Sequence, residues 1–293
     1  MSPKNKDGKK PQAVPLSDLL RLPLGPVSIA DLDPAATPGY PGDGKDDAPE
    51  LTAALAPELS DLQEMLYASG RSAPEKAPRV LVVLQGMDTS GKGGVIRHAI
   101  GLVDPQGVDL TAFKAPTPEE RKHNYLWRIR NALPGAGKIG IFDRSHYEDV
   151  LVVRVESLVP EDVWSKRYDE INRFEAELVA DGVRVIKCML NISSDEQKSR
   201  LAARLDDPTK YWKYNPGDVD VREKWPAYME AYEAALANCN TEAAPWYVIP
   251  SNRKWYRNWA VAELLRETLA GMGLAWPAAE FDVATEQKRV AES

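Results

Sequence analysis

The residues with the clearest chemical potential lie in one glycine-rich segment, Gly86-Met-Asp-Thr-Ser-Gly-Lys-Gly-Gly94. The segment matches the pattern G-x-x-x-x-G-K, in which backbone amides and a helix N-terminus surround a phosphate group while the lysine adds a positive charge. A glycine-rich turn without function would leave the position of the lysine to chance. We therefore predict that phosphate is bound by residues of this loop, namely Gly86, Met87, Thr89, Ser90, Gly91, Lys92 and Gly93.

One departure from the pattern indicates how a metal ion would be held. The Ser or Thr that usually follows the lysine and binds magnesium is replaced by Gly93. Two carboxylates are available instead, Asp88 inside the loop and Asp143 at the end of Ile-Gly-Ile-Phe-Asp. Because carboxylate oxygens suit Mg²⁺, we predict that Asp88 and Asp143 bind Mg²⁺, with Mn²⁺ as the alternative ion. Asp88 is also a candidate base, and a helix N-cap is the other role open to Asp143.

Basic residues follow in a predicted helix and the aromatic loop after it. Arg200 and Arg204 are four residues apart, so they project from one helix face, and Lys210 and Lys213 come next. We predict a basic helical lid over about residues 198–225 that closes on the transferring phosphoryl group, with Arg204 as the catalytic cation. A solvated charged surface is the alternative for any one of these residues.

A second basic cluster lies between Lys114 and Arg130. Lys114, Arg121 and Arg128 are candidates for a groove that binds a long anion, together with Arg200, Lys210 and Lys213. Surface pairing with Glu119 and Glu120 competes with this interpretation.

Along the chain, segments with the pattern of buried strands alternate with segments that have the pattern of amphipathic helices. Continuous apolar runs predict strands over 80–85, 139–142, 183–192 and 246–249. Helical periodicity predicts intervening helices, among them 48–69, ended by Gly70, and 258–270. This alternation is typical of an α/β protein with a parallel sheet covered on both faces, which binds its ligands at the carboxyl ends of the strands.

The two ends of the chain lack this alternation of strands and helices. Residues 1–47 are rich in Pro, Gly, Asp and Lys and are predicted to form a flexible tail, with a short docking segment around residues 16–24. We expect the main domain to span 48–280 and a frayed tail to follow over 281–293.

Composition excludes several classes of protein. A net charge of −7 argues against a general nucleic-acid binder, and two cysteines give no disulfide framework. No apolar run approaches the roughly 20 residues that span a bilayer, and no secretory signal is visible. We therefore expect a cytoplasmic protein without membrane contact.

Five blocks of the sequence together resemble the type 2 polyphosphate kinases, P-loop enzymes similar in fold to thymidylate kinase. The likeness runs in order from about residue 51 to 274. Its blocks are GMDTSGKGG (86–94), KAPTPEER (114–121), FDRSHYEDVLVVRV (142–155), DPTKYWKY (207–214) and APWYVIPSNRKWYRN (244–258). The first and third blocks look most like the subgroup that uses AMP as well as ADP. This chain departs from the family pattern at Gly93, where the subgroup often has an acid, and at Asp143, where Asn is frequent.

The resemblance implies a three-layer α/β/α P-loop kinase with a helical lid. It implies that Asp88 and Asp143 are the catalytic and magnesium-associated carboxylates and that Lys92 and Arg144 hold phosphates. It also places Tyr147 and Glu148 among the nucleotide-binding residues.

The activity expected from this resemblance is reversible, Mg²⁺-dependent phosphoryl transfer from inorganic polyphosphate to AMP or ADP, by a homodimer or homotetramer. An ATP-dependent nucleoside or nucleotide kinase would share the loop, the Asp143 strand end and the lid. A silent scaffold that binds polyphosphate is the third hypothesis, against which the set Asp88, Lys92 and Asp143 argues.

Overall fold

The computed structural model describes residues 14–293. Its centre is a five-stranded sheet in the order β2-β3-β1-β4-β5, with every neighbouring pair parallel. The strands are β1 Arg79–Gln85, β2 Val108–Ala112, β3 Ile139–Asp143, β4 Val183–Asn191 and β5 Trp246–Pro250. The four predicted strands are confirmed, and β2 is an additional, half-exposed edge strand. All carboxyl ends lie at one edge, which brings the segments after β1, β3 and β4 together.

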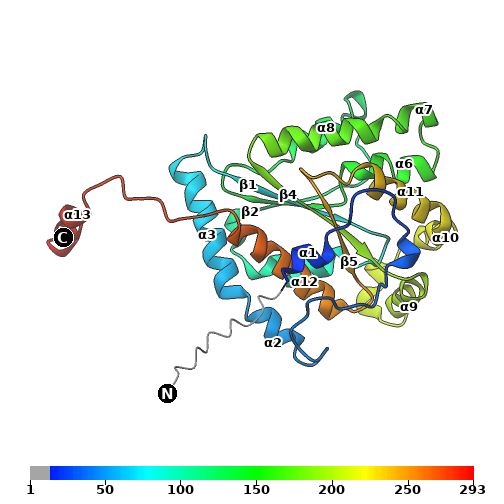
Figure 1. Ribbon diagram of the computed structural model, residues 1–293, viewed down its shortest axis with the longest axis horizontal. Coiled ribbons are helices and arrows are strands. Elements are labelled where there is room, and N and C mark those ends of the chain that lie inside the picture. Colours follow the sequence, from blue (N-terminus) through cyan, green and yellow to red (C-terminus); the bar gives the residue numbers. More distant parts are fainter. Residues whose placement is uncertain (1–13) are drawn as a thin grey trace, which may run out of the picture.

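Helices cover both faces of the sheet, as predicted (Figure 1). One core layer unites the sheet with α1, α3, α4 and α12, and the other unites it with α5, α8 and α11. The α-helices are α1 Leu16–Leu20, α2 Ala48–Ala53, α3 Ala56–Ser72, α4 Lys92–His98, α5 Leu126–Asn131, α6 Val152–Val155, α7 Glu161–Trp164, α8 Arg167–Ala180, α9 Ser194–Leu205, α10 Gly217–Glu223, α11 Trp225–Asn238, α12 Lys254–Ala270 and α13 Val283–Ala291. The short 3₁₀ helices are η1 Ile29–Asp31, η2 Ile100–Leu102, η3 Pro105–Gly107, η4 Glu120–Lys122, η5 His146–Asp149 and η6 Pro208–Lys213.

The segment before α2 is not a flexible tail where the structure describes it. Leu16 and Leu20 of α1 are buried against α12, and the backbone amides of Leu16 and Ser17 donate to the Glu267 carboxylate at 2.8 and 2.9 Å. Apolar contacts and these charged hydrogen bonds together hold the segment. The tail prediction is therefore wrong for residues 14–47, the docking segment is confirmed, and residues 1–13 lie outside the described chain.

Gly70 lies inside α3 and does not end it, contrary to expectation. The helix passes so close to the loop before β3 that a Cβ on Gly70 would stand 2.8 Å from the Gly137 Cα. A Cβ on Gly137 would in turn stand 2.6 Å from the Leu66 carbonyl oxygen. The glycine at position 70 thus serves close packing between two backbones rather than helix termination.

We expect Gly137→Ala to destabilise the fold through two effects of the same sign. Gly137 has φ +71°, a left-handed conformation that costs a residue with a Cβ about 1–2 kcal/mol, and the clash with α3 adds about 1–3 kcal/mol. Gly182 is the matched control, because its φ is +81° and nothing lies within 4 Å of an added Cβ. Denaturant unfolding of both Ala variants measures the difference. Equal losses would show that the backbones can separate at no cost.

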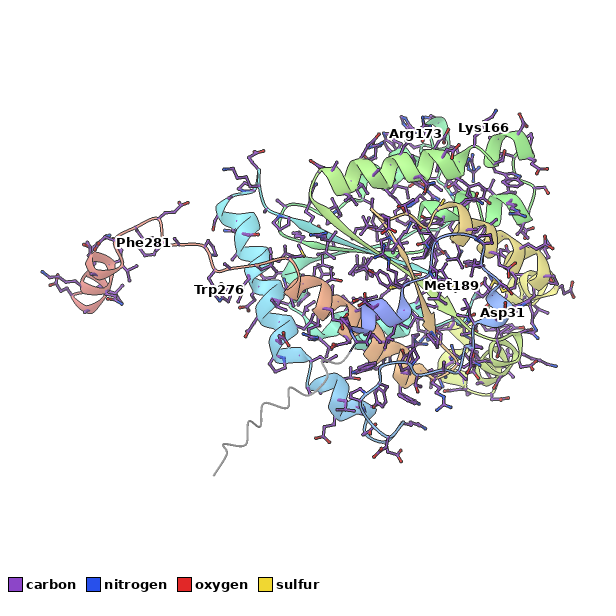
Figure 2. All side chains as sticks on the ribbon, viewed as in Figure 1. Asp31, Lys166, Arg173, Met189, Trp276 and Phe281 are labelled. Atoms are coloured by element: carbon purple, nitrogen blue, oxygen red, sulfur yellow. The ribbon has the colours of Figure 1, made fainter. Side chains whose placement is uncertain are left out.

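The carboxyl terminus leaves the body of the molecule. Trp276 and Phe281 stand in an extended segment, beyond which α13 lies apart from the remainder (Figures 1 and 2). The predicted fraying of 281–293 is wrong, since α13 is a regular helix capped by the Asp282 side chain. None of the helices in residues 14–293 is long and apolar enough to cross a membrane.

Candidate active site

The glycine-rich loop (residues 86–94) connects β1 to α4 and has a strained backbone. Gly86 and Gly91 have φ +152° and +110°, and the non-glycine Thr89 has φ +66°. Such left-handed conformations persist where the surroundings impose them, which is typical of ligand sites. The Lys92 ammonium group is buried and donates to the Gly86 carbonyl at 2.8 Å, so it closes the loop into a ring.

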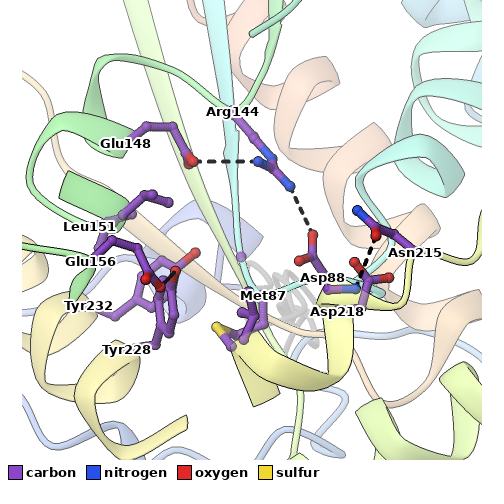
Figure 3. Close-up of a pocket in the computed structure, with 14 residues that line it drawn as sticks. Met87, Asp88, Arg144, Glu148, Leu151, Glu156, Asn215, Asp218, Tyr228 and Tyr232 are labelled. Atoms are coloured by element: carbon purple, nitrogen blue, oxygen red, sulfur yellow. Dashed lines mark hydrogen bonds and ion pairs between the residues drawn. The ribbon is translucent and has the colours of Figure 1, made fainter. Parts of the chain in front are cut away.

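Asp88 meets a positive charge supplied by the neighbouring strand end. Arg144 follows β3 directly, at φ +64°, and its Nη2 donates to Asp88 Oδ1 at 2.9 Å. Its Nη1 lies 3.7 Å from Glu148 Oε2 (Figure 3). The negative charges of Asp88, Asp143 and Glu148 all favour the charged form of Lys92. The pairing of β1 with β3 therefore joins the predicted residues Asp88, Lys92, Asp143, Arg144 and Glu148 in one constellation.

Burial and mutual charge shift the proton affinities of this constellation. Burial, together with the Arg144 guanidinium, lowers the pKa of Lys92. Burial raises the pKa of the Glu148 carboxyl, although Arg144 and Lys92 oppose the shift. Shifts caused by burial beside specific charge partners are typical of functional sites.

A cavity of about 350 Å³ opens beside Asp88 and Arg144. Its apolar wall is formed by Met87, Leu151, Val152, Val221, Tyr228 and Tyr232 (Figure 3). Glu156 lies at the same wall and accepts a hydrogen bond from the Tyr228 hydroxyl at 3.3 Å. A wall with two tyrosines next to charged groups suits a ligand with a planar ring and a phosphate end.

The predicted lid is formed by α9, η6 and α10, and it reaches the cavity through Asn215, Gly217 and Asp218. Burial raises the pKa of Asp218, and the charge of Asp88 adds to the shift, so the lid and the loop interact electrostatically. Arg204 donates to Asp218 Oδ2 at 3.2 Å and to the Lys213 carbonyl at 2.8 Å. Arg204 therefore stands at the cavity rim, one residue removed from its lining.

Two predicted polyphosphate-binding cations have other partners in the structure. Arg200 is buried and donates to the backbone oxygens of residues 89, 90, 251 and 252. Arg128 is buried too, donates to the Lys114 carbonyl at 2.8 Å and lies over the Phe113 ring. The prediction for Arg200 is wrong, because the buried guanidinium holds backbone oxygens of two loops. Arg128 also holds a loop but lines a cavity, so its role stays a prediction.

The remaining predicted cations are exposed. Lys114, with Arg128 behind it, lines a second cavity of about 330 Å³ beyond β2, and Arg121 donates to the Pro116 carbonyl nearby. In η6, Lys210 pairs with Asp207 at 2.7 Å and Lys213 lies over the exposed Trp212 ring. These cations come from two segments of the chain, the loop after β2 and η6, and their binding of polyphosphate stays a prediction.

Tyr147 is not placed to bind a nucleotide, contrary to prediction. Its ring is fully buried, its hydroxyl donates to Glu175 Oε1 at 2.8 Å, and it accepts from Lys187 Nζ at 2.9 Å. The same carboxylate pairs with His146 at 3.1 Å. This network anchors η5, which begins two residues after Arg144 and also contains Glu148.

Four residues of the cavity were not predicted from the sequence. They are Tyr228, Tyr232 and Glu156 at the wall and Asp218 in the lid. Their only visible signal was the helical spacing of the two tyrosines, which core packing explains equally well.

The carboxylates of the site suit a Mg²⁺ ion that is also bound by substrate phosphates and waters. Over the described chain no group of three or more Asp, Glu, His or Cys residues could enclose a metal ion. Mg²⁺ is usually held by one or two carboxylates, with substrate phosphates and waters completing its shell. Asp88, about one-quarter exposed, and Asp143 can provide those carboxylates.

Comparison with known proteins gives one consistent result. The family described as polyphosphate kinase 2 matches residues 44–274. An AMP/ADP-polyphosphate phosphotransferase from Meiothermus ruber is 48% identical over 258 residues, which cover 88% of this chain and 94% of that protein. An ADP-polyphosphate phosphotransferase from Rhodopseudomonas palustris is 40% identical over 78% of this chain and 81% of its own length.

The solved structures agree. The crystal structure of polyphosphate kinase 2 from Arthrobacter aurescens TC1 superimposes with a TM-score of 0.92 at 50% identity, covering 96% of this chain and 98% of that one. The fold is thus a P-loop kinase-like α/β fold, as predicted. The chain belongs to the polyphosphate kinase 2 family.

Proposed function

We propose that this protein transfers a terminal phosphoryl group from inorganic polyphosphate to AMP or ADP. The observation that carries the proposal is the Asp88–Arg144–Glu148 chain of charges between the glycine-rich loop and a tyrosine-lined cavity. The family and the activities for which its relatives are named support the donor and the acceptors.

Each part of the site has a role in this reaction. The loop amides and Lys92 hold phosphates, and the cavity beside Tyr228 and Tyr232 receives the nucleotide base. Arg144, with Arg204 from the lid, offsets negative charge as the transition state spreads it over the phosphoryl oxygens. Closure of the lid over the cavity, with Asp218 on its inner side, would exclude water, the competing acceptor.

Asp88 and Asp143 hold Mg²⁺, or Mn²⁺, in this proposal. The bound ion supplies charge neutralisation on the phosphate oxygens. A cytoplasmic homodimer or homotetramer is proposed with it, supported by the family resemblance in the sequence.

The test is phosphoryl transfer without ATP. We expect the purified protein, given polyphosphate and Mg²⁺, to convert ADP to ATP or AMP to ADP, and to lose this activity when EDTA removes the metal. AMP, ADP, GMP and GDP are assayed in parallel to establish the base preference. Nucleotide and Mg²⁺ without polyphosphate is the control. Turnover only with ATP as donor would favour the nucleoside or nucleotide kinase, and binding without turnover the scaffold.

A further inference from the structure

A second buried arginine lies directly behind the glycine-rich loop. Arg257 of α12 is 3% exposed, and its Nη1 donates to the Ser90 carbonyl at 3.0 Å. Its Nε and Nη2 donate to the neutral Asn258 side-chain oxygen at 3.2 and 2.8 Å. The guanidinium is therefore fixed against the side of the loop that carries the carbonyl oxygens.

Arg200 of α9 reaches the same loop from the lid. Its Nη1 donates to the carbonyl oxygens of Thr89 and Ser90 at 2.8 and 3.1 Å. The Ser90 oxygen thus accepts from two guanidinium groups. Hydrogen bonds in a chain polarise one another, so two cations on this oxygen strengthen the Gly91 N–H as a donor at the other end of the same peptide group.

The two arginines differ in how their charge is balanced. Arg200 pairs with Glu196 at 2.7 Å. Arg257 has no carboxylate within the 4.0 Å ion-pair distance in residues 14–293, and its acceptors are all neutral. Burial, with Arg200 close by, lowers the pKa of Arg257 to about 9, so the group still carries its charge at neutral pH. A buried cation without a counter-charge destabilises the ligand-free protein.

The glycines of the loop make room for this side chain. A Cβ on Gly91 would overlap the Arg257 guanidinium, and one on Gly94 would stand 2.5 Å from its Nη2. Gly93, by contrast, has nothing within 4 Å of an added Cβ. At two of the three glycines around Lys92 a side chain would therefore collide with Arg257, and Gly91 also has the left-handed φ of +110°.

We propose that Arg257 is a positioning residue of the phosphate site: with Arg200 it clamps the Ser90 carbonyl so that the loop amides face the phosphate, and its charge is balanced only when phosphate is bound. The proposal rests on the proposed function only in that the loop binds phosphate, whichever molecule donates it. A bound anion would relieve the uncompensated charge, so part of the phosphate affinity derives from a residue that does not touch the ligand.

The test compares three variants by Kd for tripolyphosphate and for ADP, at fixed Mg²⁺ and ionic strength, with unfolding measured alongside. We expect Arg257→Gln to raise both Kd values at least tenfold, and Arg257→Lys, which keeps the charge, to raise them much less. Arg266→Gln is the matched control on α12, because Arg266 pairs with Glu263 and Glu58 and should leave both Kd values unchanged.

A purely structural role predicts a different result. Arg257→Gln would then unfold more easily yet bind with the parent's Kd, or the Gln and Lys variants would weaken binding equally, and either outcome overturns the proposal. Should Arg257→Gln fail to fold, Gly94→Ala displaces the guanidinium without removing it, and an unchanged Kd there has the same meaning. Failure of the parent to bind tripolyphosphate would instead contradict the proposed donor, and ADP alone then decides the role of Arg257.

Discussion

Asp88→Asn should reduce phosphoryl transfer by roughly 10³-fold or more, which corresponds to about 4 kcal/mol of lost transition-state stabilisation. The amide keeps the shape of the side chain, and its oxygen can still accept a hydrogen bond from Arg144. In the parent, Arg144 Nη2 lies 2.9 Å from Asp88 Oδ1. It removes the negative charge of one of the two carboxylates that would hold Mg²⁺ and leaves Asp143 as the other. The loss should therefore lie in kcat and metal dependence, with the fold retained.

The control for this variant is Asp181→Asn. Asp181 pairs with Arg79 at the opposite edge of the sheet, where an exposed ion pair contributes little. Activity should be unchanged there. Steady-state kinetics across a Mg²⁺ titration, with unfolding curves for both variants, make the comparison. Activity of Asp88→Asn within a few-fold of the parent would exclude Asp88 as a metal ligand or base.

The sequence predicted the parts of the fold with a local signal. The strands β1, β3, β4 and β5 are continuous apolar runs because both faces are covered, and such runs are readable. The strand β2 was missed because it is a half-exposed edge of five residues with no such run. Gly70 was misread because a glycine near a helix end also suits close backbone packing, which only the tertiary structure reveals.

In the site, too, residues with a local sequence signal could be predicted, whereas residues positioned by tertiary packing could not. Asp88, Lys92 and Asp143 follow from a motif whose spacing encodes its own geometry. Arg200, in contrast, has the spacing of a lid cation, yet its helix turns that face toward the loop backbone. Residue type and spacing identify a cation, while the direction in which it points depends on the packing of elements far apart in the chain. Arg257 was missed for that reason.

The second large effect is expected in stability, at the buried pair of Lys187 and Glu175. Both side chains are at most 1% exposed, and Lys187 Nζ donates to Glu175 Oε2 and to the Cys239 carbonyl, each at 2.6 Å. Lys187→Met leaves the carboxylate and the carbonyl buried without this donor. We expect a loss of about 3–5 kcal/mol in the free energy of unfolding, a large fraction of the 5–15 kcal/mol typical of a domain.

The variant Glu175→Gln/Lys187→Met distinguishes lost pairing from lost packing. It removes both charges and keeps a side-chain oxygen for the Tyr147 hydroxyl, so it should be more stable than Lys187→Met alone. If the double variant is as unstable as the single one, the shape of Lys187 matters and its charge does not.

The pH dependence of the free energy of unfolding tests the ion pair independently. Burial alone would raise the pKa of Glu175, but Lys187 and His146 outweigh it and hold that pKa below the ordinary value of 4.5. The pair therefore stabilises the parent fully above pH 4.5, and the contribution is lost as the pH falls through the lowered pKa. Without Lys187, the charged carboxylate keeps only neutral or weaker partners, His146 and the Tyr147 hydroxyl, against the effect of burial, and the pKa of Glu175 should rise. Lys187→Met should then lose stability as the pH increases from about 5 to 8, whereas the double variant should not.

Urea unfolding of both variants at those two pH values measures this difference. A deficit of Lys187→Met that does not grow with pH would show that Glu175 is not left charged and buried, and the ion-pair account of this core would fail.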